Sequence, residues 1–275
     1  MGRQNERRTI FHGRNQSMST TIAVINHKGG VGKTTTAVNL AAGMARHGHK
    51  VLLVDLDPQG NATYGLGVDF NPGESPSISQ VLMDPEASLE SVILDTEEPN
   101  LKIIPADIRL AHTAVQLNAA VFRETRLKKA LATVPEFDYI IIDAQPTLDL
   151  LPVNAIYAAD RLLIPTELTG YALCGLSDLM STMKVTKNGG AYDFRILLTK
   201  VTGHGEDRQF HAIKYLEALS DRILKTRIRH NEAIPRSQIE TEELDPVPVV
   251  LQKSYSRGAQ DYRALVKEIL ELWPA

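Results

Sequence analysis

The sequence predicts an α/β protein in which a doubly wound, mostly parallel sheet carries helices on both faces. An apolar run at residues 21–25 leads through a glycine-rich turn into a helical pattern at 34–47, and a second apolar run follows at 51–55. Strand, helix and strand at this spacing form a βαβ unit, which requires parallel strands. The 275 residues contain 43% hydrophobic and 23% charged residues, as soluble globular proteins do, and their number fits one α/β domain.

Similar apolar runs and helical patterns continue to the end of the chain. Residues 57–77 interrupt them with many Gly, Pro and Asn residues, so we expect a long functional loop there. Residues 1–17 are polar and aperiodic, and we expect a flexible tail before a single domain over residues 18–275. The further strands are expected at 101–105, 139–143, 161–165, 194–198 and 226–228, and the further helices at 107–132, 172–186, 208–221 and 258–272.

Charge and cysteine content exclude several classes of protein. Lys and Arg number 30 and Asp and Glu number 33, so the net charge is −3 and the chain as a whole is not a basic nucleic-acid binder. The single cysteine, Cys174, excludes an intrachain disulfide and a CxxC metal or redox motif. No apolar run approaches the roughly 18 residues that span a bilayer, so we expect no stable membrane insertion and a reducing cytoplasmic location.

The strongest functional signal is the segment HKGGVGKTT at residues 27–35, which follows the first strand and opens the first helix. Its glycines let backbone N–H groups surround phosphates, and the helix N-terminus adds a positive dipole end. In loops of this kind the lysine at position 33 reaches the β- and γ-phosphates, and the Thr34 hydroxyl ligates Mg²⁺. We therefore expect a nucleotide-binding phosphate loop made of Lys28, Gly29, Gly30, Val31, Gly32, Lys33, Thr34 and Thr35.

A resemblance to a known family begins in this loop. His27 stands where the general form GxxxxGK[ST] has its first glycine, and Lys28 adds a second lysine, as in the deviant Walker A form KGGxGK[ST]. The chain thus resembles the ParA/MinD group of P-loop NTPases and, within it, the ParA/Soj partition ATPases. The resemblance implies that Lys28 reaches across an ATP-sandwich homodimer to the partner's phosphates, and that Lys28 and Lys33 both take part in catalysis.

Three acidic residues extend the resemblance. Asp55 and Asp57 follow the second strand in DLDPQGNAT, and Asp143 ends the apolar run YIIID in a Walker B pattern. Carboxylates at the carboxyl ends of parallel strands face a bound nucleotide, where they hold the metal or position water, although Asp57 alone also fits a simple Asp-Pro turn. The match to the family motif DxDPQGN implies that Asp57 orients the attacking water and that Asp55 and Asp143 belong to the metal site.

The C-terminal motifs resemble the family less closely. Residues 226–231, TRIRHN, resemble TxIPRN and add Asn231 to the expected nucleotide-contacting residues, although Arg229 and His230 replace Pro and Arg. After the Walker B aspartate, Gln145 replaces the first proline of the family's Asp-x-Pro-Pro. The resemblance runs from Thr20 to the C-terminus, so residues 18–275 are expected to form one P-loop ATPase domain.

A basic stretch at residues 222–236 carries five positive side chains against the single acid Glu232. Its excess of +4 in a chain of net charge −3 fits either a patch for an anionic polymer or a solvated face with scattered ion pairs. The resemblance favours the patch, because partition ATPases bind DNA without sequence preference through basic residues in this region. The DNA-contacting residues are then expected to be Arg208, Arg227, Arg229 and Arg236.

The resemblance as a whole implies a slow ATPase that uses ATP and Mg²⁺ in the cytoplasm. An ATP-dependent homodimer would bind non-specific DNA on the nucleoid, and a ParB-like partner would stimulate hydrolysis and release. The open alternatives are a MinD-like membrane-associated ATPase and an ATPase that positions a protein cargo. The last helix argues against the membrane alternative, because its polar face carries Asp261, Glu268 and Glu271 rather than mainly basic residues, and core packing is the better interpretation.

Overall fold

The computed structural model describes residues 19–134, 136–147, 149–168, 170–186, 192–202, 217–231, 246–252 and 255–275, with the backbone alone for residues 170–175. The tail expected at residues 1–17 lies outside the described residues. So do most of the helix expected at 208–221 and two of the expected DNA-contacting residues, Arg208 and Arg236. The prediction of a single domain over residues 18–275 stays a prediction.

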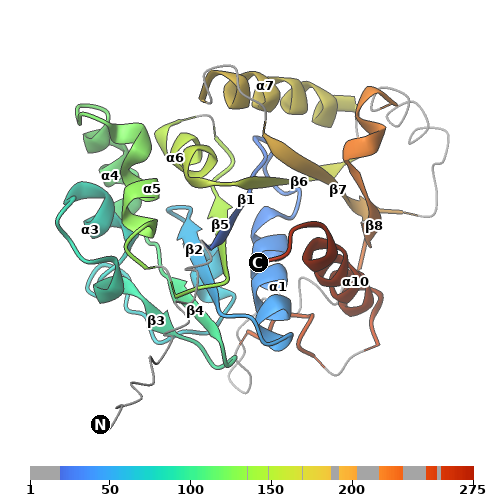
Figure 1. Cartoon of the computed structure of the whole chain (residues 1–275), viewed down its shortest axis with the longest axis horizontal. Coiled ribbons are helices and arrows are strands. Elements are labelled where there is room, and N and C mark those ends of the chain that lie inside the picture. Colours follow the sequence, from blue (N-terminus) through green and yellow to red (C-terminus); the bar gives the residue numbers. More distant parts are fainter. Residues whose placement is uncertain are drawn as a thin grey trace, which may run out of the picture.

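An eight-stranded sheet in the order β3-β4-β2-β5-β1-β6-β7-β8 forms the centre of the molecule (Figure 1). Seven strands run parallel, and β3 is antiparallel to β4. The predicted fold class is thus confirmed. The strands are β1 Thr20–Val24, β2 Val51–Leu56, β3 Leu94–Asp95, β4 Leu101–Ile104, β5 Tyr139–Ala144, β6 Arg161–Glu167, β7 Asp193–Val201 and β8 Ile223–Arg229.

The sheet divides the interior into two hydrophobic clusters because successive strand residues point to opposite faces. In β5, Tyr139 and Ile141 belong to one cluster, whereas Ile140 and Ile142 belong to the other. The first cluster is covered by α1 and α10, and the second by α3 to α7 (Figure 1). The α-helices are α1 Lys33–Arg46, α2 Asn61–Tyr64, α3 Ile78–Met83, α4 Arg109–Leu117, α5 Arg126–Leu131, α6 Leu150–Ala158, α7 Gly170–Thr186 and α10 Arg257–Leu272; the 3-10 helices are η1 Leu89–Val92, η2 Arg123–Thr125 and η3 Glu217–Arg222.

Several elements differ from the prediction. Hydrophobic periodicity did not predict β3, α3 or α6, and the expected loop at 57–77 contains the short helix α2. The helices expected at 107–132 are α4, η2 and α5, and Phe122 between α4 and η2 takes the left-handed backbone region at φ 56°. The described end of the helix expected at 208–221 is the 3-10 helix η3.

Helix α10 packs into the core, as its pattern predicts. Leu265, Val266 and Ile269 are fully buried against α1. A Cβ atom on Gly43 of α1 would lie 2.4 Å from Val266 Cγ2, so only glycine allows the two helices to approach this closely. Across the described part of the chain, no helix combines the length and the hydropathy that crossing a membrane requires.

The polar side of α10 contacts the edge strand β8. The Glu268 carboxylate accepts hydrogen bonds from the backbone N–H groups of Lys225 and Thr226, both at 2.8 Å. Asp261 accepts one from the backbone N–H of Arg229 at 2.9 Å. Glu268 and Asp261 of the last helix therefore accept hydrogen bonds from the backbone of the neighbouring strand.

Candidate nucleotide-binding site

The order of the strands brings the predicted site residues together at one edge of the sheet. Strand β5 lies between β1 and β2, and Asp143 is level with Val24 on one side and with Asp55 on the other. The phosphate loop follows β1 directly. The loop, the second acidic motif and the Walker B aspartate therefore meet at the carboxyl ends of three adjacent strands, where open α/β sheets bind ligands.

Neighbouring strands fix the conformation of the phosphate loop. The Asn26 side chain donates to Pro165 O at 2.7 Å and accepts from the Lys28 backbone N–H at 3.0 Å, which ties the loop to β6. The Thr199 hydroxyl donates to Val31 O at 2.9 Å, which ties it to β7. Gly30 and Gly32 take left-handed φ values of 74° and 89°, which favour glycine. These contacts and glycines therefore hold the phosphate loop in a cradle-shaped conformation at the N-terminus of α1.

The two lysines of the loop occupy different environments. Lys33 is buried, and its Nζ donates to Lys28 O at 3.1 Å. Burial lowers the pKa of Lys33, whereas the charges of Asp143 and Asp57 oppose that shift. The Lys28 ammonium instead lies 2.8 Å from Glu167 Oε2 at the end of β6. Lys33 thus lies inside the phosphate loop, and the Lys28 side chain lies beside the loop.

A cavity of about 730 Å³ lies over the phosphate loop, within the size range of small-molecule and cofactor sites. It is lined by the predicted residues Gly30 to Thr35, Asp57 and Asn231. Arg229, expected to contact DNA, also lines it. Lining residues that no sequence motif predicted include Ile108, Ala111 and Lys200, from α4 and β7, and Tyr262 of α10 also lines the cavity.

Asp143 has the properties of a metal ligand. It is fully buried, and neither carboxylate oxygen makes a well-formed hydrogen bond within the described part of the chain. Burial and the neighbouring Asp55 raise the pKa of Asp143 well above its ordinary value, while the nearby Thr34 hydroxyl and Lys33 oppose that shift. A hard cation such as Mg²⁺ prefers oxygen ligands of this kind. Thr34 and Asp143 are therefore the residues that would hold Mg²⁺.

Asp55 differs from Asp143 because its oxygens already have partners. Oδ1 accepts from the Asp57 backbone N–H at 3.1 Å, and Oδ2 accepts from Thr63 N and Thr63 Oγ1 at 2.9 and 2.8 Å. Burial raises the pKa of Asp55 to about 7, although these hydrogen bonds act in the opposite direction. The structure shows Asp55 holding the segment that carries Asp57; its expected place in the metal shell stays a prediction.

The segment after β2 presents Asp57 to the cavity. Asp57 Oδ1 accepts from the Gln59 backbone N–H at 2.9 Å, so Asp57 forms the Asp-Pro turn and also lines the cavity over the phosphate loop. Gly60 follows with a left-handed φ of 65°, and a Cβ atom there would lie 2.8 Å from Ala106 O. Both backbone strain and space therefore require glycine at position 60.

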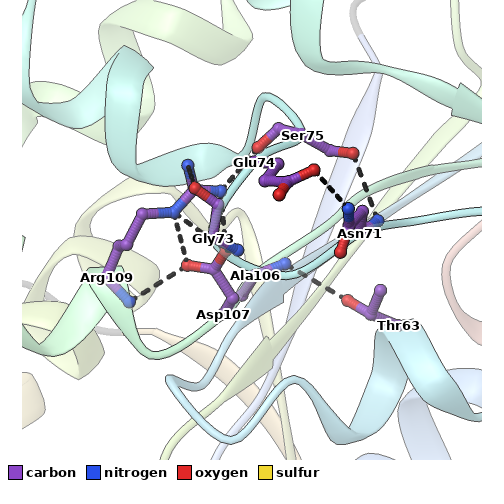
Figure 2. Close-up of polar contacts among 8 residues, drawn as sticks. All are labelled: Thr63, Asn71, Gly73, Glu74, Ser75, Ala106, Asp107 and Arg109. Atoms are coloured by element: carbon purple, nitrogen blue, oxygen red, sulfur yellow. Dashed lines mark hydrogen bonds and ion pairs between the residues drawn. The ribbon is translucent and has the colours of Figure 1, made fainter.

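A polar clasp connects this segment with the rest of the 57–77 loop (Figure 2). Thr63 Oγ1 accepts from the Ala106 backbone N–H at 3.2 Å, and the adjacent Asp107 accepts from Gly73 N at 2.9 Å. Arg109 donates to both Asp107 oxygens and to the backbone oxygens of Gly73 and Ser75. Although burial alone would raise the pKa of Asp107, the Arg109 and Gly73 hydrogen bonds lower it. The expected loop is therefore anchored to the start of α4.

The basic stretch is only partly available to a ligand. Lys225 and Arg227 are exposed on the edge strand β8. Arg229 instead forms an ion pair with Asp261, with Nη2 2.6 Å from Oδ1, and this hydrogen bonding raises the pKa of Arg229. The sequence pattern did not reveal this partner, which lies 32 residues away. The positive charge of Arg229 is thus balanced within the chain, and its role in DNA binding stays a prediction.

Fold and site together define a P-loop nucleotide-binding protein, and comparisons with known proteins agree. A family described as an AAA domain matches residues 19–196. The sporulation initiation inhibitor protein Soj of Bacillus subtilis is 40% identical over 260 residues, covering 92% of this chain and 98% of Soj. The chromosome partitioning protein ParA of Caulobacter vibrioides is 34% identical over 259 residues, covering 90% and 93%. The chain belongs to this AAA domain family and to the ParA/Soj group of partition ATPases within the P-loop NTPases.

Solved structures with the same fold contain nucleotides. The ATP complex of a single-residue variant of Cyanothece McdA has a TM-score of 0.78 at 25% identity and covers 93% of this chain and 97% of its own. Cobyrinic acid a,c-diamide synthase from Mycobacterium smegmatis, with a bound ATP analogue and magnesium, has a TM-score of 0.74 at 29% identity and covers 94% and 96%. The relatives Soj and ParA favour partition over the MinD-like alternative.

Proposed function

We propose that this chain is a cytoplasmic partition ATPase. Its ATP-bound homodimer binds the DNA of the nucleoid and is released from that DNA after hydrolysis. The observation that carries the proposal is the meeting of three groups behind one cavity. These groups are the phosphate loop, the buried Lys33, and the carboxylate of Asp143 beside the Thr34 hydroxyl. Together they suit a nucleoside triphosphate with its magnesium ion.

Each residue then has a separate task. The backbone N–H groups of Gly30 to Thr35 surround the phosphates, and Lys33 reaches the β- and γ-phosphates from inside the cradle. Thr34 and Asp143 would hold Mg²⁺, which neutralises charge on the phosphate oxygens when bound. Asp57 orients the attacking water, and Asp55 keeps Asp57 in place through the backbone. Lys28 reaches the phosphates of the partner subunit in the closed dimer.

DNA binding belongs to the dimer in this proposal. Lys225 and Arg227 are exposed on β8, and dimerisation brings two copies of this strand to one assembly. Contacts from lysine and arginine to phosphates do not depend on base sequence, so binding is non-specific and sensitive to salt. Intrinsic hydrolysis is slow, and a ParB-like protein bound to the cargo accelerates it.

A combined assay of assembly and hydrolysis tests the proposal. Light scattering should report a dimer with ATP and Mg²⁺ but not with ADP or after chelation of Mg²⁺, and gel shifts should detect DNA binding only under the dimer-forming condition. Phosphate release should be slow with ATP alone and faster with DNA and a ParB-like protein. Binding to anionic lipid vesicles without binding to DNA would favour the membrane alternative and contradict the proposal.

A further inference from the structure

A cluster of three charged residues lies beside the phosphate loop and is not explained by the site described above. Glu167 ends β6, Lys28 follows β1, and Lys200 lies near the end of β7. Glu167 Oε2 is 2.8 Å from Lys28 Nζ, and Glu167 Oε1 is 2.8 Å from Lys200 Nζ. The Glu167 carboxylate thus bridges two ammonium groups, one from the loop after β1 and one from β7, and these two strands flank β6.

The position of Lys200 connects this cluster with the nucleotide cavity. Lys200 lines the cavity, and its Nζ lies 4.0 Å from the point that a Cβ atom on Gly30 would occupy. Its backbone takes a left-handed φ of 52°, which is uncommon for a residue with a side chain. The fold therefore tolerates local strain at the residue that places this ammonium group over the phosphate loop.

Glu167 has consequences for a bound polyphosphate. A carboxylate beside a phosphate site repels its ligand unless nearby cations balance the charge. Here two lysines balance one carboxylate, and their hydrogen bonds lower the pKa of Glu167 although burial would raise it. The Glu167 side chain is 18% exposed, so loss of both cations would leave a poorly hydrated charge without a partner.

We propose that Glu167 is a positioning residue that holds Lys28 away from the dimer interface in the free chain, and that Lys200 remains on Glu167 when Lys28 leaves. The inference rests on the proposed function, because Lys28 must move from Glu167 to the partner's phosphates when the dimer closes. Lys200 lowers the free energy that is needed to move Lys28 away from Glu167, because the Glu167 carboxylate then keeps one cation beside it. Dimer closure is then controlled by the exchange of a single ion pair.

Variants of Glu167 and Lys200 should shift dimerisation in opposite directions. At saturating ATP, Glu167→Gln should lower the protein concentration at half-dimerisation roughly two- to fivefold, the range expected for one ion pair. Lys200→Met should raise that concentration, because departure of Lys28 would then leave Glu167 without a cation. The double variant Lys200→Met/Glu167→Gln should restore dimerisation to at least the wild-type level.

One further variant and one further measurement distinguish the exchange of the Lys28–Glu167 ion pair from a general effect of charge on nucleotide binding. Glu167→Asp keeps the charge but shortens the side chain, so it cannot hold both lysines and should also ease dimerisation. The affinity of each monomer for ADP should change less than its dimerisation does. Asp95→Asn, which removes the carboxylate paired with Lys102 at the antiparallel edge of the sheet, is the matched control and should behave as wild type.

Light scattering over a protein concentration series with ATP and Mg²⁺, together with ADP titrations by calorimetry, measures all of these variants. If wild type dimerises with ATP but Glu167→Gln and Glu167→Asp reach half-dimerisation at the same protein concentration as wild type, this inference is overturned. The proposed function would remain intact. Equal shifts in ADP affinity and dimerisation would also overturn the inference, in favour of a general field effect. A wild-type chain that stays monomeric with ATP would contradict the proposed function itself.

Discussion

At the level of single residues, the two lysines of the phosphate loop differ in how deeply they are buried. Lys33 is 6% exposed inside the cradle, whereas the side chain of Lys28 is 33% exposed and paired with Glu167. A cation buried close to the phosphates contributes to every nucleotide-bound state. In the proposed dimer, a cation beside the cavity would contribute only when a partner brings phosphates within its reach.

Lys33→Ala should therefore weaken binding of both ATP and ADP by the monomer. The loss of charged hydrogen bonds of about 1.5–3 kcal/mol corresponds to an affinity reduced by about ten- to hundredfold. Titration calorimetry measures this loss, and Lys50→Ala, at an exposed lysine, is the control. An unchanged affinity for ADP would contradict the assignment of the phosphate loop.

Asp57→Ala should separate assembly from hydrolysis. Closure of the dimer does not need the carboxylate that orients water, so the variant should accumulate as an ATP-bound dimer. Its hydrolysis should fall by about 10²–10⁴-fold, the usual contribution of a positioned acid or base. Phosphate release and light scattering are the two readouts, with the exposed Asp69→Ala as control. Hydrolysis at the wild-type rate would remove Asp57 from the reaction.

The raised pKa of Asp55 predicts how stability depends on pH. Its pKa rises from an ordinary 3.8 to about 7 in the folded chain, so the folded state holds the proton more tightly. The resulting stabilisation is present below the unfolded pKa and is lost as pH rises towards 7. Without nucleotide or Mg²⁺, the free energy of unfolding of wild type minus that of Asp55→Asn should fall between pH 4 and pH 7. Urea titrations at several pH values test this, and a constant difference would contradict it.

Sequence spacing predicted the residues of the phosphate loop and the three aspartates, because each lies in a compact motif at or just after the end of a strand. It did not predict the partners that decide their roles. Thr63 donates twice to Asp55 from eight residues further along the chain, and Glu167 meets Lys28 across 139 residues. Such contacts depend on how the chain folds back and on which strands become neighbours, and local spacing contains no information about that.

At the level of elements, the polar clasp at the start of α4 explains why the 57–77 loop has a defined conformation. Arg109→Ala should leave the buried Asp107 without its main cation and should destabilise the fold by about 1–3 kcal/mol. Limited proteolysis within residues 67–77 should become faster in the same variant. Arg123→Ala removes an arginine from an exposed ion pair and is the control. Proteolysis at the wild-type rate would contradict the anchoring role.

Element boundaries were predictable where hydrophobic periodicity was strong. The pattern of α10 predicted its buried face. The continuous apolar runs of the central strands predicted that both faces of these strands are buried. Helix α6, LLPVNAIYA, is apolar on nearly all sides and has no clear helical period, and β3 contains two residues. Elements of these kinds are recognised only when the packing around them is known.

At the level of the whole molecule, two copies of β8 should act together on DNA. Arg227→Glu should weaken binding to unrelated sequences alike and should leave ATP-driven dimerisation intact. The plot of log affinity against log salt should become less steep by about 0.9 for each phosphate contact that is lost. Gel shifts at several salt concentrations measure this, with Lys102→Glu, at an exposed lysine near the opposite edge of the sheet, as control. Equal slopes in both variants would contradict the use of this surface.

The contacts between α10 and β8 have a consequence for how copies of the protein can associate. An edge strand with open backbone N–H groups invites another chain to extend the sheet, which leads to uncontrolled polymerisation. Here Glu268 and Asp261 already occupy three of those N–H groups. Carboxylates that were expected only as the polar face of a helix thus disfavour strand addition at the described part of this edge.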